Sequence, residues 1–251
     1  MLIDQTMEKM RSLRLYGMTR AYEEQRALPE MSGMPFDDRF GLLVDREEIE
    51  RDNAKYRSRL KRARLRETAC IEDLDFGPAR GLDKKQILTF RSGEWVKQSQ
   101  NILITGPTGS GKTHLACAFL NETCKLGFSS RFFRLPRLLE DIVVAKADGR
   151  YINLMDSLAK TQVLVLDDWG LSVFTEDQRR NILEILEDRY GVRSTIITSQ
   201  LPLEKWFEVI GEPTLADAIM DRIVNGAHKI PLAGPSMRKV KSGLTEKKAK
   251  V

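Results

Sequence analysis

The chain has 251 residues, of which 41% are hydrophobic and 31% are charged, as is typical of a protein with a buried core. It contains no apolar run long enough to cross a membrane, and its first residues lack the apolar stretch of a secretory signal. The cysteines at positions 70, 117 and 124 form no C-x-x-C pair, which argues against a disulfide framework or a zinc site. We therefore expect a reducing, cytoplasmic location and no membrane partner.

The formal net charge of +5 is unevenly distributed. Residues 51–66 hold eight basic residues and one acidic residue, and residues 238–250 hold six basic residues and one acidic residue. Such blocks suggest a polyanionic partner such as nucleic acid. Charge alone leaves a second interpretation open, in which the blocks are a solvated helix face and a basic tail.

Residues 1–66 predict a small helical module. Six apolar residues recur at helical spacing, with one extra residue between the third and the fourth: Met7, Met10, Leu13, Leu15, Met18 and Tyr22. After Pro35 we expect a second helix that begins at Asp37 or Asp38 as N-cap and continues into the basic block. Four apolar residues mark its expected buried side: Phe40, Leu42, Leu43 and Ile49.

Residues 67–251 alternate between apolar runs and helical segments. The expected strands are 101–105, 129–135, 162–166, 194–198 and 229–232. Between the third and fourth strands, residues 175–190 predict a helix that Thr175 caps. This alternation predicts a parallel α/β sheet flanked by helices.

The first of these strands runs into a loop that matches G-x-x-x-x-G-K-[ST] in full. Its glycines let successive backbone N–H groups point at phosphate oxygens. Lys112 would contact the β- and γ-phosphates, while the hydroxyl group of Thr113 would ligate Mg²⁺. The predicted ATP-binding residues are Gly106, Pro107, Thr108, Gly109, Ser110, Gly111, Lys112, Thr113 and His114. For His114 we favour packing at the helix start over a catalytic role.

Two aspartates directly follow the third strand, at the strand end where open α/β sheets bind their ligands. We assign Asp167 to the metal and Asp168 to polarising the attacking water. Asp168 stands where related ATPases more often use Glu. Because its side chain is shorter, we expect slow intrinsic hydrolysis.

Five segments occur in the order and at the spacing of one known family: GPTGSGKTHLA, VLVLDDWG, TIITSQLP, PTLADAIMDRIV and PSMRK. The chain resembles, over nearly its whole length, the AAA+ ATPases of IstB-type insertion-sequence helpers, which are related to DnaC-type helicase loaders. The resemblance implies an AAA+ P-loop core with a five-stranded parallel sheet. It also implies a reduced C-terminal lid, since 84 residues follow Asp167 (251 − 167).

The resemblance also implies roles for single residues. The first sensor of γ-phosphate falls within the triplet 198–200, where we favour Gln200 over Thr198 and Ser199. Arg222 corresponds to an arginine finger presented to the neighbouring subunit's ATP, and Arg238 to a second sensor within the same subunit. For both arginines a surface ion pair remains the alternative.

The function implied is that of an ATP- and Mg²⁺-dependent homo-oligomer that assembles on duplex DNA and assists a transposase. The expected DNA contacts, without sequence specificity, are Lys55, Arg57, Arg59, Lys61, Arg62 and Arg64 on one continuous helix. The main alternative is a loader of replicative helicases that acts on single strands. A small-molecule kinase would need an arginine-bearing lid and an acceptor site, neither of which the sequence indicates. A fourth possibility is a scaffold protein, in which bound ATP has a structural role and turnover is incidental.

Overall fold

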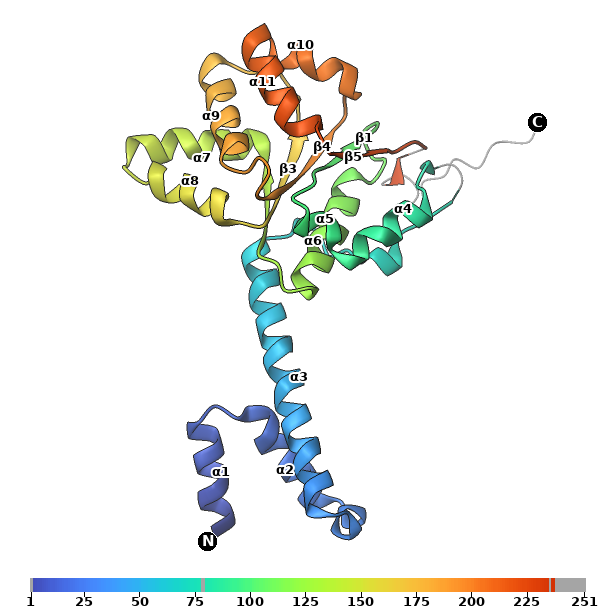
Figure 1. Cartoon of the computed structure of the whole chain (residues 1–251), viewed down its shortest axis with the longest axis vertical. Coiled ribbons are helices and arrows are strands. Elements are labelled where there is room, and N and C mark those ends of the chain that lie inside the picture. Colours follow the sequence, from blue (N-terminus) through green and yellow to red (C-terminus); the bar gives the residue numbers. More distant parts are fainter. Residues whose placement is uncertain (1, 78–79, 235, 238–251) are drawn as a thin grey trace, which may run out of the picture. The chain divides into compact units, whose positions relative to one another are not determined.

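A computed structural model describes residues 2–77, 80–234 and 236–237. The chain divides into two compact units, Met1–Ser58 and Arg59–Val251 (Figure 1). The sequence-based division after residue 66 stays a prediction. The predicted second sensor, Arg238, lies outside the described residues.

The N-terminal unit consists of helices α1 (Leu2–Ser12) and α2 (Tyr16–Ala27), the 3-10 turn η1 (Pro29–Gly33) and most of helix α3 (Phe36–Ala63). The extra residue in the apolar spacing coincides with the break between α1 and α2, where Arg14 adopts a left-handed φ of 59°. The predicted N-cap is wrong. Since α3 begins at Phe36, both Asp37 and Asp38 lie in its first turn, where the helix dipole favours acidic residues.

The buried side of α3 differs from the prediction. Leu43 is buried, but three other expected core residues are 44–55% exposed: Phe40, Leu42 and Ile49. Glu47 takes a buried position instead, at 7% exposure. Its carboxylate accepts hydrogen bonds from the backbone N–H groups of Gly17 (2.7 Å) and Met18 (3.1 Å). The first turn of α2 lacks a side-chain cap of its own, so Glu47 satisfies donors that would otherwise be unpaired.

The end of α3 also differs. The helix stops at Ala63, and Arg64 follows in a left-handed conformation with φ 53°. The prediction that all six DNA contacts lie on one continuous helix is therefore wrong for Arg64, which lies just beyond the end of α3.

The second unit contains a five-stranded, all-parallel sheet with the order β2-β3-β4-β1-β5. Its strands are β1 (Ile102–Thr105), β2 (Ser130–Arg134), β3 (Val163–Trp169), β4 (Ser194–Ser199) and β5 (His228–Pro231). All five predicted strands are confirmed. The strand β3 extends past its apolar run through both aspartates, because Trp169 still pairs with Ser199 of β4.

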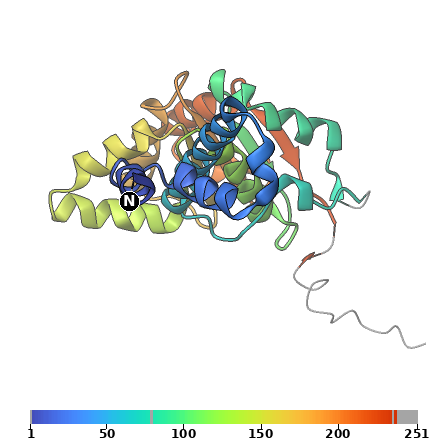
Figure 2. The ribbon, with the colours of Figure 1, turned by 90° about the horizontal axis from the view of Figure 1, so that it is seen from below.

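Helices flank this sheet in an α/β arrangement, with α7 and α8 side by side in both views (Figure 1, Figure 2). The longer helices are α6 (Lys112–Lys125), α7 (Leu135–Ala147), α8 (Tyr151–Lys160), α9 (Glu176–Glu187) and α11 (Pro213–Val224). The shorter elements are η2 (Ile71–Asp73), α4 (Lys84–Thr89), η4 (Phe90–Ser92), α5 (Glu94–Lys97), η5 (Leu203–Lys205) and α10 (Trp206–Ile210). The predicted cap of α9 is confirmed, since Thr175 and Gln178 form a capping box.

The core lies between the sheet and these helices. Residues 163–166 of β3 are at most 1% exposed. The ring of Trp169 is fully buried in this core, where it contacts Phe174 edge-on and lies 5.3 Å from the ring of Trp206. Cys117 and Cys124 are buried in α6, as expected of structural thiols. None of the helices in the described part of the chain is long and apolar enough to span a membrane.

Candidate nucleotide-binding site

The loop between β1 and α6 has a backbone that requires glycine. Gly106 and Gly109 adopt φ angles of 149° and 82°, which L-residues with a side chain rarely adopt. A Cβ atom on Gly106 would lie 2.4 Å from the carbonyl oxygen of Leu232, and one on Gly109 would lie 2.2 Å from the Ser236 hydroxyl. The curled loop therefore forms only with glycine at these positions.

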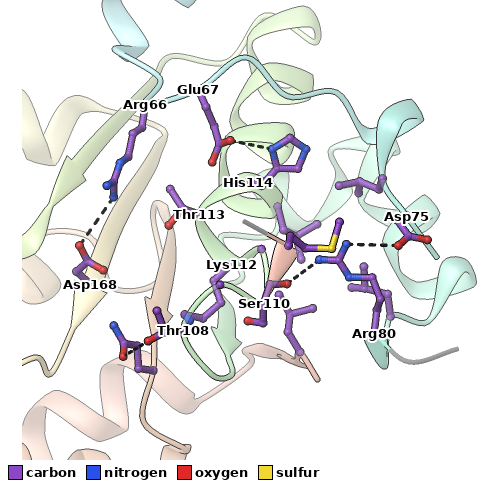
Figure 3. Close-up of a pocket in the computed structure, with 18 of the residues that line it drawn as sticks. Arg66, Glu67, Asp75, Arg80, Thr108, Ser110, Lys112, Thr113, His114 and Asp168 are labelled. Carbon is purple, nitrogen blue, oxygen red and sulfur yellow. Dashed lines mark hydrogen bonds and ion pairs between the residues drawn. The ribbon is translucent and has the colours of Figure 1, made fainter. Parts of the chain in front are cut away.

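A cavity of about 390 Å³ opens beside this loop. Residues 108–115 form one wall, and side chains from distant segments form the others (Figure 3). Among these are Asp168 from β3, Gln200 after β4, and the three arginines Arg66, Arg80 and Arg134. The phosphate loop, one of the two predicted acids and the favoured sensor thus meet at one cavity.

The loop offers donors that suit a phosphate group. The Lys112 ammonium donates to the carbonyl oxygens of Gly106 (2.7 Å) and Pro107 (2.9 Å). The hydroxyl of Ser110 is buried and has no hydrogen-bond partner among the described residues. A buried hydroxyl without a partner is destabilising, and an anion seated in the loop would supply the missing acceptor. The residues present therefore fit a phosphate.

The predicted metal residues lie in contact. The Thr113 hydroxyl donates to Asp167 at 3.0 Å, and the Thr198 hydroxyl donates to the same carboxylate. Hydroxyl and carboxylate oxygens are the ligands that Mg²⁺ prefers, completed by water and phosphate oxygens. In the described part of the chain no cluster of three His, Cys, Asp or Glu side chains suits a metal. The site thus fits Mg²⁺ held together with a nucleotide rather than in a protein-only cage.

Asp167 carries an unfavourable buried charge. It is 0% exposed, and burial, followed by the neighbouring charge of Asp168, raises its pKa. Hydrogen bonds from Thr198 and Thr113 and the charge of Arg66, 3.3 Å away, act in the opposite direction. Any cation at this position would stabilise the ionised carboxylate.

Asp168 reaches the cavity with its carboxylate already paired. The side chain is 18% exposed and lies 2.9 Å from the Arg134 guanidinium, with Arg66 at 4.0 Å. Its backbone is left-handed, with φ 65°, which is uncommon for a residue other than glycine and concentrates at functional sites. Asp168 therefore lies where a water-polarising group is expected, but in this structure its carboxylate is paired with Arg134.

The three candidates for the first sensor have different partners. The Gln200 side-chain oxygen accepts from the Thr108 hydroxyl of the loop at 2.6 Å, while Thr198 contacts Asp167. Ser199 is buried and donates to the carbonyl oxygen of Trp169 at 2.9 Å. Ser199 thus has a structural role, and the choice between Gln200 and Thr198 stays open.

His114 lines the cavity and lies 3.1 Å from the carboxylate of Glu67. The contact ties the start of α6 to the segment that follows α3. The preference for packing at the helix start over a catalytic role stays a prediction for His114.

The structure does not bring Arg222 to this cavity. Arg222 lies in the last turn of α11, pairs with Glu187 and donates to the carbonyl oxygen of Ala218 at 2.8 Å. It borders a different cavity together with Arg189. Arg222 therefore lies apart from Lys112 within the chain.

The predicted DNA contacts fall into two groups. Lys55 and Arg57 form exposed ion pairs with Asp52 and Glu50. Of the four in the second unit, Lys61 is exposed, and three border another cavity: Arg59, Arg62 and Arg64.

Sequence reasoning missed the arginines of the nucleotide cavity. Arg80 donates to the carbonyl oxygen of Ser110 at 2.8 Å, and Arg66 contacts Asp167. For Arg134 a signal existed. It ends β2, and neighbouring parallel strands end at one edge, so it pairs in register with Asp167 of β3. For Arg66, at a bend after α3, and Arg80, in a 3-10 turn before α4, the spacing offers no such signal.

A family model described as "IstB-like ATP binding protein" matches residues 8–245. The chain belongs to this family. It is 44% identical over 239 residues to a protein of Sinorhizobium fredii described as the insertion sequence ATP-binding protein y4pL, covering 95% of this chain and 98% of that protein. It is 47% identical over 203 residues to an insertion sequence IS1162 ATP-binding protein of Pseudomonas fluorescens, covering 80% and 88%.

Among solved structures, the DnaC helicase loader matches with a TM-score of 0.55 at 24% identity, covering 65% of this chain and 96% of that one. The expected AAA+ P-loop fold of this IstB-like chain is thus confirmed, and its family is one that binds ATP.

Proposed function

We propose that this IstB-like chain is a Mg²⁺-dependent ATPase that assembles as a homo-oligomer on duplex DNA and assists a transposase in the cytoplasm. The observation that supports it most is the phosphate-loop cavity, where Lys112, Thr113 and Asp167 converge in a chain of the insertion-sequence family. The relatives in mobile elements support DNA and a transposase as partners.

In this proposal the residues of the cavity have separate tasks. Lys112 binds the terminal phosphates, and Thr113 and Asp167 hold Mg²⁺, which would offset charge developing on the phosphate oxygens. Asp168 orients and deprotonates the attacking water. The Arg134 ion pair must open before Asp168 can accept a proton, so basal hydrolysis is slow and a partner can accelerate it.

Arg222 acts in trans. A guanidinium at the γ-phosphate stabilises the transition state of phosphoryl transfer by roughly 10³- to 10⁵-fold in other NTPases. Arg222 borders a cavity other than that of its own phosphate loop, so this role requires a neighbouring subunit. Oligomerisation and hydrolysis are then coupled, because ATP bridges the two chains.

The main alternative is a helicase loader. The fold likeness to the DnaC helicase loader supports it, although at 24% identity that likeness concerns the fold alone. The two functions differ in the DNA form that stimulates turnover, which is duplex for the transposition helper and single-stranded for the loader.

The test is steady-state ATP hydrolysis by the full chain without DNA, with duplex and with single strands, alongside Asp168→Asn as the inactive control. We expect low basal turnover and strong stimulation by duplex. Stimulation by single strands alone would favour the loader. If neither form of DNA stimulates turnover, ATP is a structural ligand and the proposal is contradicted.

A further inference from the structure

A second cavity of about 440 Å³ lies between the end of α3, the start of β2 and the end of α8. All of its lining residues are cations or carry a hydroxyl group: Arg59, Arg62, Arg64, Arg131 and Lys160, with Ser129, Ser130, Ser157 and Thr161. Among the residues that the structure describes, the lining includes no carboxylate and no aromatic ring. Such a cavity attracts anions and offers a nucleobase no aromatic ring on which to stack.

Acidic side chains of the described residues balance only part of the positive charge in the cavity. Lys160 has a carboxylate partner, Asp156 at 3.1 Å. For Arg62, Arg64 and Arg131, the described residues provide no acidic partner within ion-pair distance. The cavity therefore holds at least three guanidinium groups whose charge only solvent or a ligand can balance.

Arg131 is the centre of this arrangement. Its guanidinium lies over the ring of Phe133 at 4.7 Å and donates to the Ser157 hydroxyl at 2.8 Å, which uses one of five donors. Ser157 in turn donates to the carbonyl oxygen of Leu154 at 2.8 Å, so α8 holds the arginine in place. Burial, and then the charge of Arg64, lowers the pKa of Arg131. An anion would relieve both effects.

We propose that this cavity binds a backbone phosphate of DNA, with Arg131 as its central ligand and Arg62 and Arg64 at its rim. Guanidinium forks match phosphate geometry, and arginine and serine side chains supply the phosphate contacts that position proteins on DNA without reading sequence. The absence of an aromatic ring from the lining favours a phosphate of the backbone over a free nucleotide. This assignment rests on the proposed function, and it adds residues of β2 and α8 to the DNA contacts expected on α3.

The test measures how the affinity of the full chain for random-sequence duplex, with ATP and Mg²⁺, depends on salt. The variant is Arg64→Gln with Arg131→Gln, because glutamine removes the charge while it keeps part of the apolar stem and an N–H donor. Arg180→Gln, an exposed arginine of α9 paired with Glu176, is the control that loses charge elsewhere. Binding of a fluorescent ATP analogue verifies that each variant is folded.

Each phosphate contact contributes about 0.9 to the slope of log K against log salt. We expect the double variant to lose about one unit of slope and to bind roughly tenfold more weakly at 0.1 M salt, while Arg180→Gln changes neither. Equal slopes for the double variant and the control would overturn the assignment, with the proposed function intact. If wild-type protein binds no DNA, both fail.

A second arm distinguishes the sources of phosphate. The melting temperature is measured in sodium phosphate and in sodium chloride of equal ionic strength. The phosphate loop is present in both proteins, so only the difference between their shifts reports on this cavity. If phosphate stabilises the wild type more than the double variant while the DNA slopes are equal, the cavity takes a free or peptide-borne phosphate, and the DNA assignment is wrong. If phosphate inhibits duplex binding by the wild type but not by the double variant, the DNA assignment is supported.

Discussion

At the residue scale, Asp167 is a carboxylate without contact to water. Its pKa is raised by burial and by Asp168, so its stabilising contribution is present below its unfolded value of 3.8 and is lost as the pH rises through the folded value. At neutral pH, without a metal, the ionised Asp167 therefore destabilises the fold. This fits a residue kept for ligand binding rather than for stability.

We expect Asp167→Asn to raise the melting temperature of the nucleotide-free protein by about 2–4 °C, the shift that roughly 1 kcal/mol produces in a domain of this size. Asparagine removes the buried charge and still accepts hydrogen bonds from Thr113 and Thr198. The same variant should lose the further stabilisation by ATP and Mg²⁺. Thermal unfolding with and without ligand measures both, with exposed Asp217→Asn as control. A lower melting temperature without nucleotide would contradict this account.

Asp168 is expected to act on hydrolysis and not on binding. Its carboxylate contacts Arg134 and Arg66, whereas Lys112 and Thr113 hold the phosphates and the metal. Asp168→Asn should lower kcat by about 10²- to 10⁴-fold, the usual contribution of a general base, with ATP affinity within a few-fold of wild type. Single-turnover hydrolysis and equilibrium nucleotide binding separate the two. An equal loss of affinity would assign Asp168 to the metal instead.

At the element scale, Glu47 holds α2 against α3. Its pKa is lowered: burial opposes the shift, but the hydrogen bond from Arg51 and those from Met18 and Gly17 outweigh it. The stability that Glu47 contributes is present above its unfolded pKa and is lost as the pH falls through the folded one.

Glu47→Gln should destabilise the N-terminal unit by about 1–3 kcal/mol, the cost of weakening buried hydrogen bonds to a charged group. ATP binding should persist, because the phosphate loop lies in the second unit. Hydrogen exchange of the amides of Gly17 and Met18 reports the local effect. Exposed Glu48→Gln is the matched control, and an equal effect of both variants would sink the idea of an interhelical cap.

The same elements indicate how far sequence patterns reach. The strands were predictable because strands of a parallel sheet, covered on both faces, read as continuous apolar runs, and the phosphate loop because its backbone needs glycine at fixed positions. The buried side of α3 was not predictable, because a polar residue, Glu47, fills a buried position that an apolar pattern cannot reveal. The contact of Arg66 with Asp167 was not predictable either, because the two residues are 101 positions apart in the chain.

At the scale of the whole molecule, the predicted arginine finger, Arg222, borders a cavity other than the nucleotide cavity. If Arg222 acts on ATP as proposed, ATP and a second subunit must meet at one site. DNA binding then follows assembly, because many copies multiply weak phosphate contacts.

The central claim is tested most directly by sedimentation velocity of the full chain with random-sequence duplex or single strands, each with ATP or ADP. We predict large complexes only with ATP and duplex. Lys112→Ala should abolish them by preventing ATP binding, and Arg222→Ala should bind ATP yet fail to assemble. Complexes of equal size with ADP, or in the Lys112 variant, would contradict ATP-dependent assembly, and complexes on single strands alone would favour the helicase loader.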